Sequence, residues 1–307
     1  MDSSDKRLGP FGYLTLYLFT WGGAVVYLRQ TGADWTFPLV SLGVFGLGLS
    51  LLTLVLTHWS NPPPVIVKRP ALETGAILAF LVVYAFGFLG WAMQALQAAM
   101  PPGQGQEVAI LVVKLIAHVV LPAILLVALG AHLEPLLETH LDRRGFWLTL
   151  SVLGIALIGL LAVVSPSVHQ IQDLKPKFST LAWAAPMAFV WMALEAGLTE
   201  EFLFRAVLQT RLAALLKSEW GALLIGAVLF ALAHFPGLYF RGDPGVDGYS
   251  TDPWQVIAFT IATLSPLAIL FGTIWSRTRS LLLCVLLHAA VDVLPALPDF
   301  LRIWAPQ

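Results

Sequence analysis

Three charged residues stand together in an otherwise apolar segment, and their types suit acid–base chemistry. Glu200 and Glu201 are adjacent, and Arg205 follows four residues after the second acid. Near the centre of a bilayer each such charge costs roughly 2.5 to 3.5 kcal/mol, so the group needs pairing and a wet cavity. On a helix Glu201 and Arg205 share a face and are predicted to form an ion pair. Glu200 points about 100° away and is left available as a general base.

Two histidines and a further acid occupy the apolar segments that follow. His234 stands four residues after Phe230 and two before Pro236, while His288 and Asp292 are four residues apart. A single histidine or a single Glu/Arg pair in a membrane is explained by hydrogen bonding between helices. The whole set, gathered in the last third of a chain with few charges, indicates a functional site instead.

The composition of the chain is that of an integral membrane protein. Of its 307 residues, 58% are hydrophobic and only 11% are charged, against roughly 25% charged in ordinary soluble domains. The net charge of -1 provides no basic surface, which argues against nucleic acid as a partner. The single cysteine, Cys284, excludes an internal disulfide and a cysteine-based metal or redox pair.

The elements that must position these residues are membrane-spanning helices. Nine apolar runs approach the roughly 20 residues that cross a bilayer, at 11–28, 37–57, 72–96, 108–130, 146–165, 181–200, 220–236, 254–275 and 280–297. We therefore predict an all-α polytopic transmembrane bundle of about nine spans. Helical patterning continues from 180 to 216, about 55 Å at helical rise, which requires a bend near Gly197, a strong tilt, or a second half lying in the interface.

The loop charges predict the orientation of the bundle. Lysine and arginine, including Lys6 and Arg7 before the first span, are more frequent on the side of the N-terminus than on the other side. The positive-inside tendency then places the N-terminus in the cytoplasm, and we expect a bacterial plasma membrane. By helical rise the polar residues lie within the bilayer, nearer its outer side.

Three further polar residues lie within predicted spans. Lys114 and His118 stand near the start of the fourth span, where we expect Lys114 to extend toward the lipid headgroups and to serve structure. Glu195 precedes Glu200 by nearly one and a half turns. Its position is compatible with lining the same cavity and equally with packing.

The order of these motifs resembles a known family. Glu-Glu-x-x-x-Arg, Phe-x-x-x-His and His-x-x-x-Asp follow one another on successive helices. This order resembles the CPBP family of CAAX proteases and bacteriocin-processing intramembrane endopeptidases, which includes type II CAAX prenyl endopeptidases. Relatives also have Asn at the position of Asp292. The resemblance covers a protease core at 146–300, and an N-terminal transmembrane region of about four spans, 1–145, lies outside it. It implies a helical bundle around a water-filled catalytic cavity.

The resemblance also implies roles for individual residues. Glu200 corresponds to the base that activates water, assisted by His234. Glu201 and Arg205 would hold the helix and the charge balance of the site. None of these roles needs a covalent intermediate between enzyme and substrate.

The last motif leaves two chemistries open. His288 and Asp292 would bind or polarise the substrate carbonyl, but an aspartate donates a hydrogen bond to an oxyanion only when protonated. An ionised Asp292 would instead orient His288 or help to bind a cation. No cofactor is required with certainty, yet His234 and His288 with a carboxylate could form a three-ligand zinc site. Both metalloprotease and glutamic protease chemistry therefore remain open.

These observations lead to an expected function and to rivals from other classes. We expect an intramembrane endopeptidase acting on a membrane-proximal peptide or protein, which could be a prenylated CAAX-type, sorting-signal or secreted-peptide substrate. The expected partners are this substrate and membrane lipid. The alternative is a non-catalytic immunity or regulatory protein that uses the same cavity for binding. A transporter is a third possibility, because embedded carboxylates also serve proton relays.

Overall fold

The computed structural model describes residues 8–244 and 246–305, and within them every regular element is a helix. The elements labelled η are π-type segments, except the 3₁₀ turn η4. In chain order they are α1 (Pro10–Gln30), α2 (Thr36–Ser41), η1 (Leu42–Leu49), α3 (Ser50–Leu56), α4 (Pro70–Val83), η2 (Tyr84–Ala92), α5 (Met93–Ala99), α6 (Gln104–Leu115), η3 (Ile116–Val120), α7 (Leu121–Ala128), η4 (Glu134–Leu136), α8 (Arg143–Val164), α9 (Ser167–Leu174), α10 (Phe178–Met192), η5 (Ala193–Leu198), α11 (Thr199–Glu201), η6 (Phe202–Gln209), α12 (Thr210–Leu216), α13 (Glu219–Ala233), α14 (Phe235–Arg241), α15 (Pro253–Thr278) and α16 (Leu281–Trp304).

These elements join into the nine membrane-length helices that the sequence predicts. Within the described residues, nine continuous helical stretches are long and apolar enough to cross a bilayer, from Pro10–Gln30 to Leu281–Trp304. The all-α polytopic fold is therefore confirmed. The orientation remains a prediction, since Lys6 and Arg7, on which it partly rests, lie outside the described residues.

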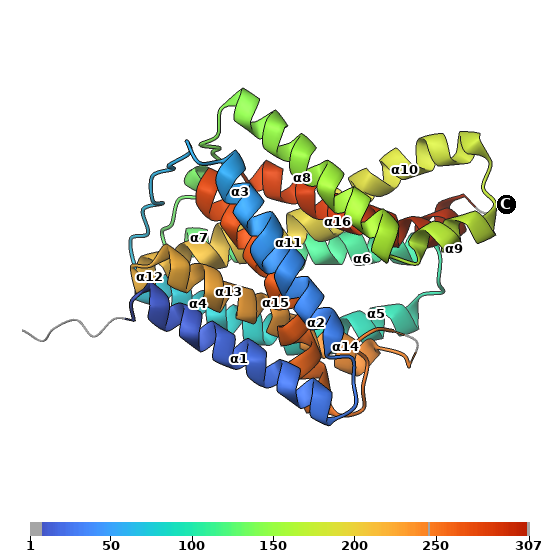
Figure 1. Ribbon diagram of the computed structural model, residues 1–307, viewed down its shortest axis with the longest axis horizontal. Coiled ribbons are helices and arrows are strands. Elements are labelled where there is room, and N and C mark those ends of the chain that lie inside the picture. Colours follow the sequence, from blue (N-terminus) through green and yellow to red (C-terminus); the bar gives the residue numbers. More distant parts are fainter. Residues whose placement is uncertain (1–7, 245, 306–307) are drawn as a thin grey trace, which may run out of the picture.

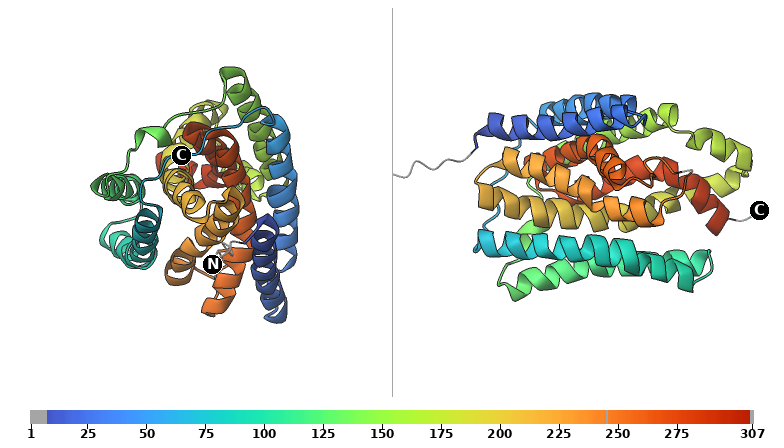
Figure 2. Two further views of the ribbon diagram at one scale, coloured as in Figure 1. Left: turned by 90° about the vertical axis from the view of Figure 1, so that its left-hand side faces the viewer. Right: turned by 90° about the horizontal axis from the view of Figure 1, so that it is seen from below.

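The spans form layers around a central helix. Figure 2 shows α1 with the helix of α2 and α3 (blue) on one side, α13, α15 and α16 (orange to red) in the middle, and the helices of the third and fourth spans (cyan to green) on the other side. The central helix is α15 (Figure 1), which contacts α1, α13 and α16, among others. The third and fourth spans pack on the middle layer through η6, α12 and α14.

Two tight connections at one end of the bundle have the same construction. In each, a lysine or arginine ends one helix in the left-handed conformation and the following serine caps the next helix. Lys217 (φ 51°) precedes Ser218, whose hydroxyl accepts from the backbone N–H of Gly221. Arg279 (φ 49°) precedes Ser280, whose hydroxyl accepts from the N–H of Leu283. Such caps satisfy helix N-terminal donors, and they set α13 and α16 directly beside the helices before them.

The long sixth span is one continuous helical stretch, Phe178–Leu216, with 39 residues. The π-type segments η5 and η6 flank the short α11, which carries both glutamates. The hydroxyl of Thr199 donates to the backbone oxygen of Glu195 at 2.7 Å and so satisfies a carbonyl at the first irregular turn. Every residue of η6 is buried. Of the three alternatives for this span, a second half lying in the interface does not agree with the structure, because η6 passes through the interior of the bundle.

Gly197 is a point where the sixth span packs closely against α16. A Cβ atom at this position would lie 2.6 Å from the backbone oxygen of Val285. We expect Gly197→Ala to lower the free energy of unfolding by about 1–3 kcal/mol, as overpacking does. Thermal unfolding of the purified protein in detergent measures the loss. Gly159→Ala in α8 is the matched control, because its Cβ meets no atom within 4 Å; equal melting temperatures for the two variants would contradict close packing at Gly197.

Candidate active site

The predicted ion pair between Glu201 and Arg205 is present and fully enclosed. Nε of Arg205 lies 3.2 Å from Oε2 of Glu201, and the side chains are 2% and 0% exposed. The N–H does not point at this oxygen, so the contact is a charge pair rather than an aligned hydrogen bond. The other oxygen of Glu201, Oε1, lies 2.7 Å from Nδ1 of His288. Glu201 therefore joins the sixth span to α16.

Aromatic rings complete the surroundings of the arginine. The guanidinium carbon of Arg205 lies 4.6 Å from the ring centre of Phe230 and 5.8 Å from that of Phe271. Phe271 also stacks on the imidazole of His288, with ring centres 4.9 Å apart. Cation–π contacts stabilise a cation that is withdrawn from water. Phe271 on α15 therefore holds Arg205 and His288 in place together.

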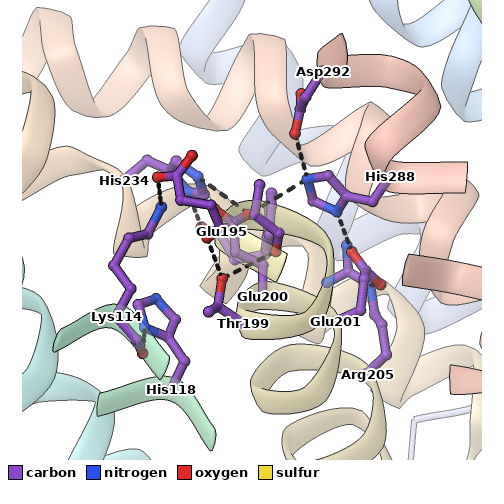
Figure 3. Close-up of polar contacts among 12 residues, drawn as sticks. Lys114, His118, Glu195, Thr199, Glu200, Glu201, Arg205, His234, His288 and Asp292 are labelled. Carbon is purple, nitrogen blue, oxygen red and sulfur yellow. Dashed lines mark hydrogen bonds and ion pairs between the residues drawn. The ribbon is translucent and has the colours of Figure 1, made fainter. Parts of the chain in front are cut away.

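His288 faces carboxylate oxygens with both ring nitrogens. Nδ1 points at Glu201, and Nε2 lies 3.2 Å from Oδ2 of Asp292 and 3.8 Å from Oε2 of Glu200 (Figure 3). Carboxylates accept hydrogen bonds and cannot donate when ionised. These surroundings favour the doubly protonated imidazolium form of His288, with an N–H at each nitrogen.

His234 faces Glu200 from the opposite side. Its Nδ1 lies 2.9 Å from the backbone oxygen of Phe230, and its Nε2 lies 3.8 Å from Oε2 of Glu200. A nitrogen beside a carbonyl oxygen must carry the proton, so in neutral His234 the lone pair is on Nε2. The backbone N–H of His234 bonds to Ala231 instead, where the helix breaks before Phe235. That break leaves the carbonyl of Phe230 free to orient the ring.

Glu200 and His234 open onto a cavity of about 480 Å³. Its walls come from η2 and α5, from α6 and η3, from the sixth span, and from α13, α14 and the residues that follow α14. The third and fourth spans therefore supply one wall, although they lie in the N-terminal region that the sequence motifs do not reach. The other members of the set, Glu201, Arg205, His288 and Asp292, lie behind the cavity wall rather than lining it.

A second group of polar residues also lines the cavity, on the third, fourth and sixth spans. Nζ of Lys114 lies 2.6 Å from Oε1 of Glu195 (Figure 3). His118 is hydrogen bonded to Tyr84. All four residues line the cavity. The expectation that Lys114 extends to the headgroups is wrong, because an acid on the sixth span gives it a partner inside the bundle. Glu195 does line the cavity, which decides between the two readings of its position.

The histidines as they lie do not fit a zinc site. Among the described residues, no group of three or more His, Cys, Asp and Glu side chains is arranged to hold a metal ion. A zinc-bound histidine must offer a lone pair, whereas both nitrogens of His288 face carboxylates.

Sequence patterns alone do not reveal several residues of this site. Phe271 is one aromatic residue in a long apolar run, and Tyr84 and Glu107 belong to spans without a motif. Arg241 could have been found, since it stands seven residues after His234, and residues with this spacing share a helix face. Each of these residues acquires its role from a helix distant in sequence.

The fold and the site together define a polytopic helical membrane protein with an enclosed carboxylate–histidine centre beside a cavity. Residues 182–294 match the family model described as Type II CAAX prenyl endopeptidase Rce1-like. This match supports the assignment to the CAAX protease family that the motifs predicted. No curated protein and no solved structure matches the chain.

The matched segment contains the cavity residues of the sixth and seventh spans but not those of the third and fourth spans. Glu200, Glu201, Arg205, His234, His288 and Asp292 all lie within it. The wall formed by the third and fourth spans lies outside it. The protein is thus an integral membrane protein whose cavity is partly built by helices beyond the segment that resembles the protease family.

Proposed function

We propose that the protein is an intramembrane endopeptidase that hydrolyses a peptide bond in a membrane-proximal peptide or protein through water activated by Glu200 with His234. The observation that carries this proposal is the 3.8 Å separation between Oε2 of Glu200 and Nε2 of His234 at the cavity wall. Both atoms are acceptors when Glu200 is ionised and His234 is neutral. Such a pair is too far apart for a direct hydrogen bond, and a water that donates to each atom fits between them.

The reaction then follows from the positions of the protons. Glu200 takes a proton from the water as its oxygen attacks the carbonyl carbon of the peptide bond, and His234 orients the water through its second hydrogen. The tetrahedral intermediate collapses when the C–N bond breaks and the leaving nitrogen receives the proton held by Glu200. The products are a new carboxyl group and a new amine, and Glu200 is ionised again.

The buried residues support this chemistry electrostatically. The imidazolium of His288 lies next to Glu200 and supplies positive charge where the oxyanion develops. Glu201 holds that imidazolium from behind, and Arg205 balances Glu201. Asp292 bonds to the nitrogen of His288 that faces the site. It therefore acts as an ionised residue that orients His288 and does not itself donate to the oxyanion.

Cleavage by the purified protein tests the proposal directly. The protein would be reconstituted in lipid nanodiscs and incubated with a pool of lipid-anchored, fluorescence-quenched peptides, and mass spectrometry would identify new termini. We expect cleavage at defined bonds by the wild type. Absence of any product, together with a cellular phenotype that a Glu200 variant retains, would instead support a non-catalytic binding protein.

Chelation tests whether this chemistry needs a metal ion. Because Glu200 and His234 are placed to activate water without a metal ligand set, we expect cleavage rates to be unchanged after treatment with EDTA or 1,10-phenanthroline. The measurement compares the initial cleavage rate of the untreated protein with that of the protein after treatment with the chelator and its removal. Loss of the rate and its recovery with zinc alone would assign His234 and His288 as metal ligands instead.

A further inference from the structure

Arg241 is a cation of the cavity wall that has no acidic partner in the described part of the chain. Among the described residues it forms no ion pair, and its buried Nε donates no hydrogen bond. The other lysine or arginine of the wall, Lys114, is neutralised by Glu195 at 2.6 Å. A partly buried guanidinium without a counter-charge is costly. The cavity therefore retains one positive group that a ligand could neutralise.

The position of Arg241 relates it to Glu200 and His234. The cavity is lined by His234, Gly237, Leu238 and Arg241, which lie at spacings of three, four and seven residues and so share one face of the helix. Seven residues of helical rise separate His234 from Arg241 by about 10 Å. An extended peptide that places a carbonyl at Glu200 would thus bring groups a few residues away to the guanidinium.

The absence of a side chain at Gly237 keeps this path open. A Cβ atom there would lie 3.1 Å from Nη2 of Arg241. The guanidinium therefore extends along the helix over Gly237, in the direction of His234. A larger residue at this position would displace it.

We infer that Arg241 binds a carboxylate of the substrate peptide, within a few residues of the bond that is cleaved. This inference rests on the proposed function for the position of that bond. Guanidinium is suited to the task because its planar N–H groups match a carboxylate with two parallel hydrogen bonds. The carboxylate can be the C-terminus of the peptide or an acidic side chain, since both present the same group.

Matched peptides distinguish these two sources. Lipid-anchored peptides cut by the wild type would be made with a free C-terminal acid or an amide, and with Glu or Gln in turn at each position on either side of the cleaved bond. We expect at least about a tenfold higher kcat/KM for the carboxylate form, mainly through KM, as the loss of a charge-assisted hydrogen bond implies. If only the C-terminal amide lowers kcat/KM, the bound carboxylate is the C-terminus of the peptide. If only a Glu-to-Gln change lowers it, the bound carboxylate is an acidic side chain.

Variants then assign the preference to Arg241. Arg241→Gln should abolish the higher kcat/KM for carboxylate peptides, and Arg241→Lys should retain part of this preference. Arg29→Gln is the control, because Arg29 also stands in the last turn of a helix but packs over Trp35 away from the cavity. A preference that survives in Arg241→Gln would overturn the inference and leave Arg241 as a helix-terminal cation only. Equal cleavage of every peptide by the wild type would overturn it as well.

A binding measurement separates this inference from the proposed function. Fluorescence anisotropy of the same labelled peptides with the Glu200→Gln protein reports affinity without cleavage. If no peptide is cut but the carboxylate forms still bind more tightly through Arg241, the proposed function fails and the carboxylate site stands. If peptides are cut and neither cleavage nor binding depends on the carboxylate, the carboxylate site fails alone.

Discussion

We expect the Glu200→Gln protein to fold normally and to cleave peptides with a kcat lower by roughly a hundred- to ten-thousand-fold, the range that general acid–base catalysis supplies. Glutamine keeps the shape of the side chain and its place at the cavity wall. It cannot accept a proton from water at neutral pH, and its amide cannot return one to the leaving nitrogen. The measurement is single-turnover cleavage in nanodiscs, with KM determined separately.

The control for this variant lies in the same cavity. Glu107→Gln removes a cavity-lining acid that has no histidine beside it within the described residues, so it should lose little of kcat. Equal melting temperatures for the two variants would show that the difference arises in chemistry and not in folding. A Glu200→Gln protein with nearly the wild-type kcat would eliminate Glu200 as the base.

The largest effect on stability is expected at Arg205. Arg205→Met leaves the carboxylate of Glu201 enclosed without its guanidinium, and removing one partner of a buried ion pair typically costs about 3–5 kcal/mol. The double variant Glu201→Gln/Arg205→Met should recover part of this loss, because no unpaired charge remains and glutamine can still accept from His288. Equilibrium unfolding in mixed micelles measures each variant and the coupling between the two sites.

An exposed pair provides the comparison. Arg302 and Asp299 are 52% and 73% exposed, so Arg302→Met should change the free energy of unfolding only slightly. A loss at Arg205 as small as that at Arg302 would show that Glu201 is neutralised by His288 alone. A double variant that loses as much as the sum of its two single variants would mean that the ion pair contributes no coupling.

The fold could be predicted from sequence because the bilayer imposes a strong rule. An apolar run of about 20 residues has few alternatives to a membrane helix, and all nine runs became spans. The path of the sixth span could not be predicted, since length alone does not distinguish an interfacial helix from a buried one. The buried face of η6 depends on α13 and α15, which pack around it.

The site was only half predictable for a related reason. Spacing of four residues placed Glu201 with Arg205 and His288 with Asp292, because contacts within one helix follow from its geometry. The contacts of His288 with Glu201 and of Lys114 with Glu195 join different helices. The spacing of residues along the sequence does not predict contacts between different helices. The expectation for Lys114 failed because its partner lies on the sixth span.

The cavity is assembled from two parts of the chain that are distant in sequence. Glu200 and His234, which we propose to activate water, lie on the sixth and seventh spans, while the third and fourth spans supply the facing wall through residues such as Glu107 and Lys114. Substitutions on those two spans can change the shape and charge of the cavity without touching Glu200 or His234. Selection for a new substrate can therefore act on one pair of helices while the hydrolytic residues stay constant, and proteins with the same motifs need not share a substrate.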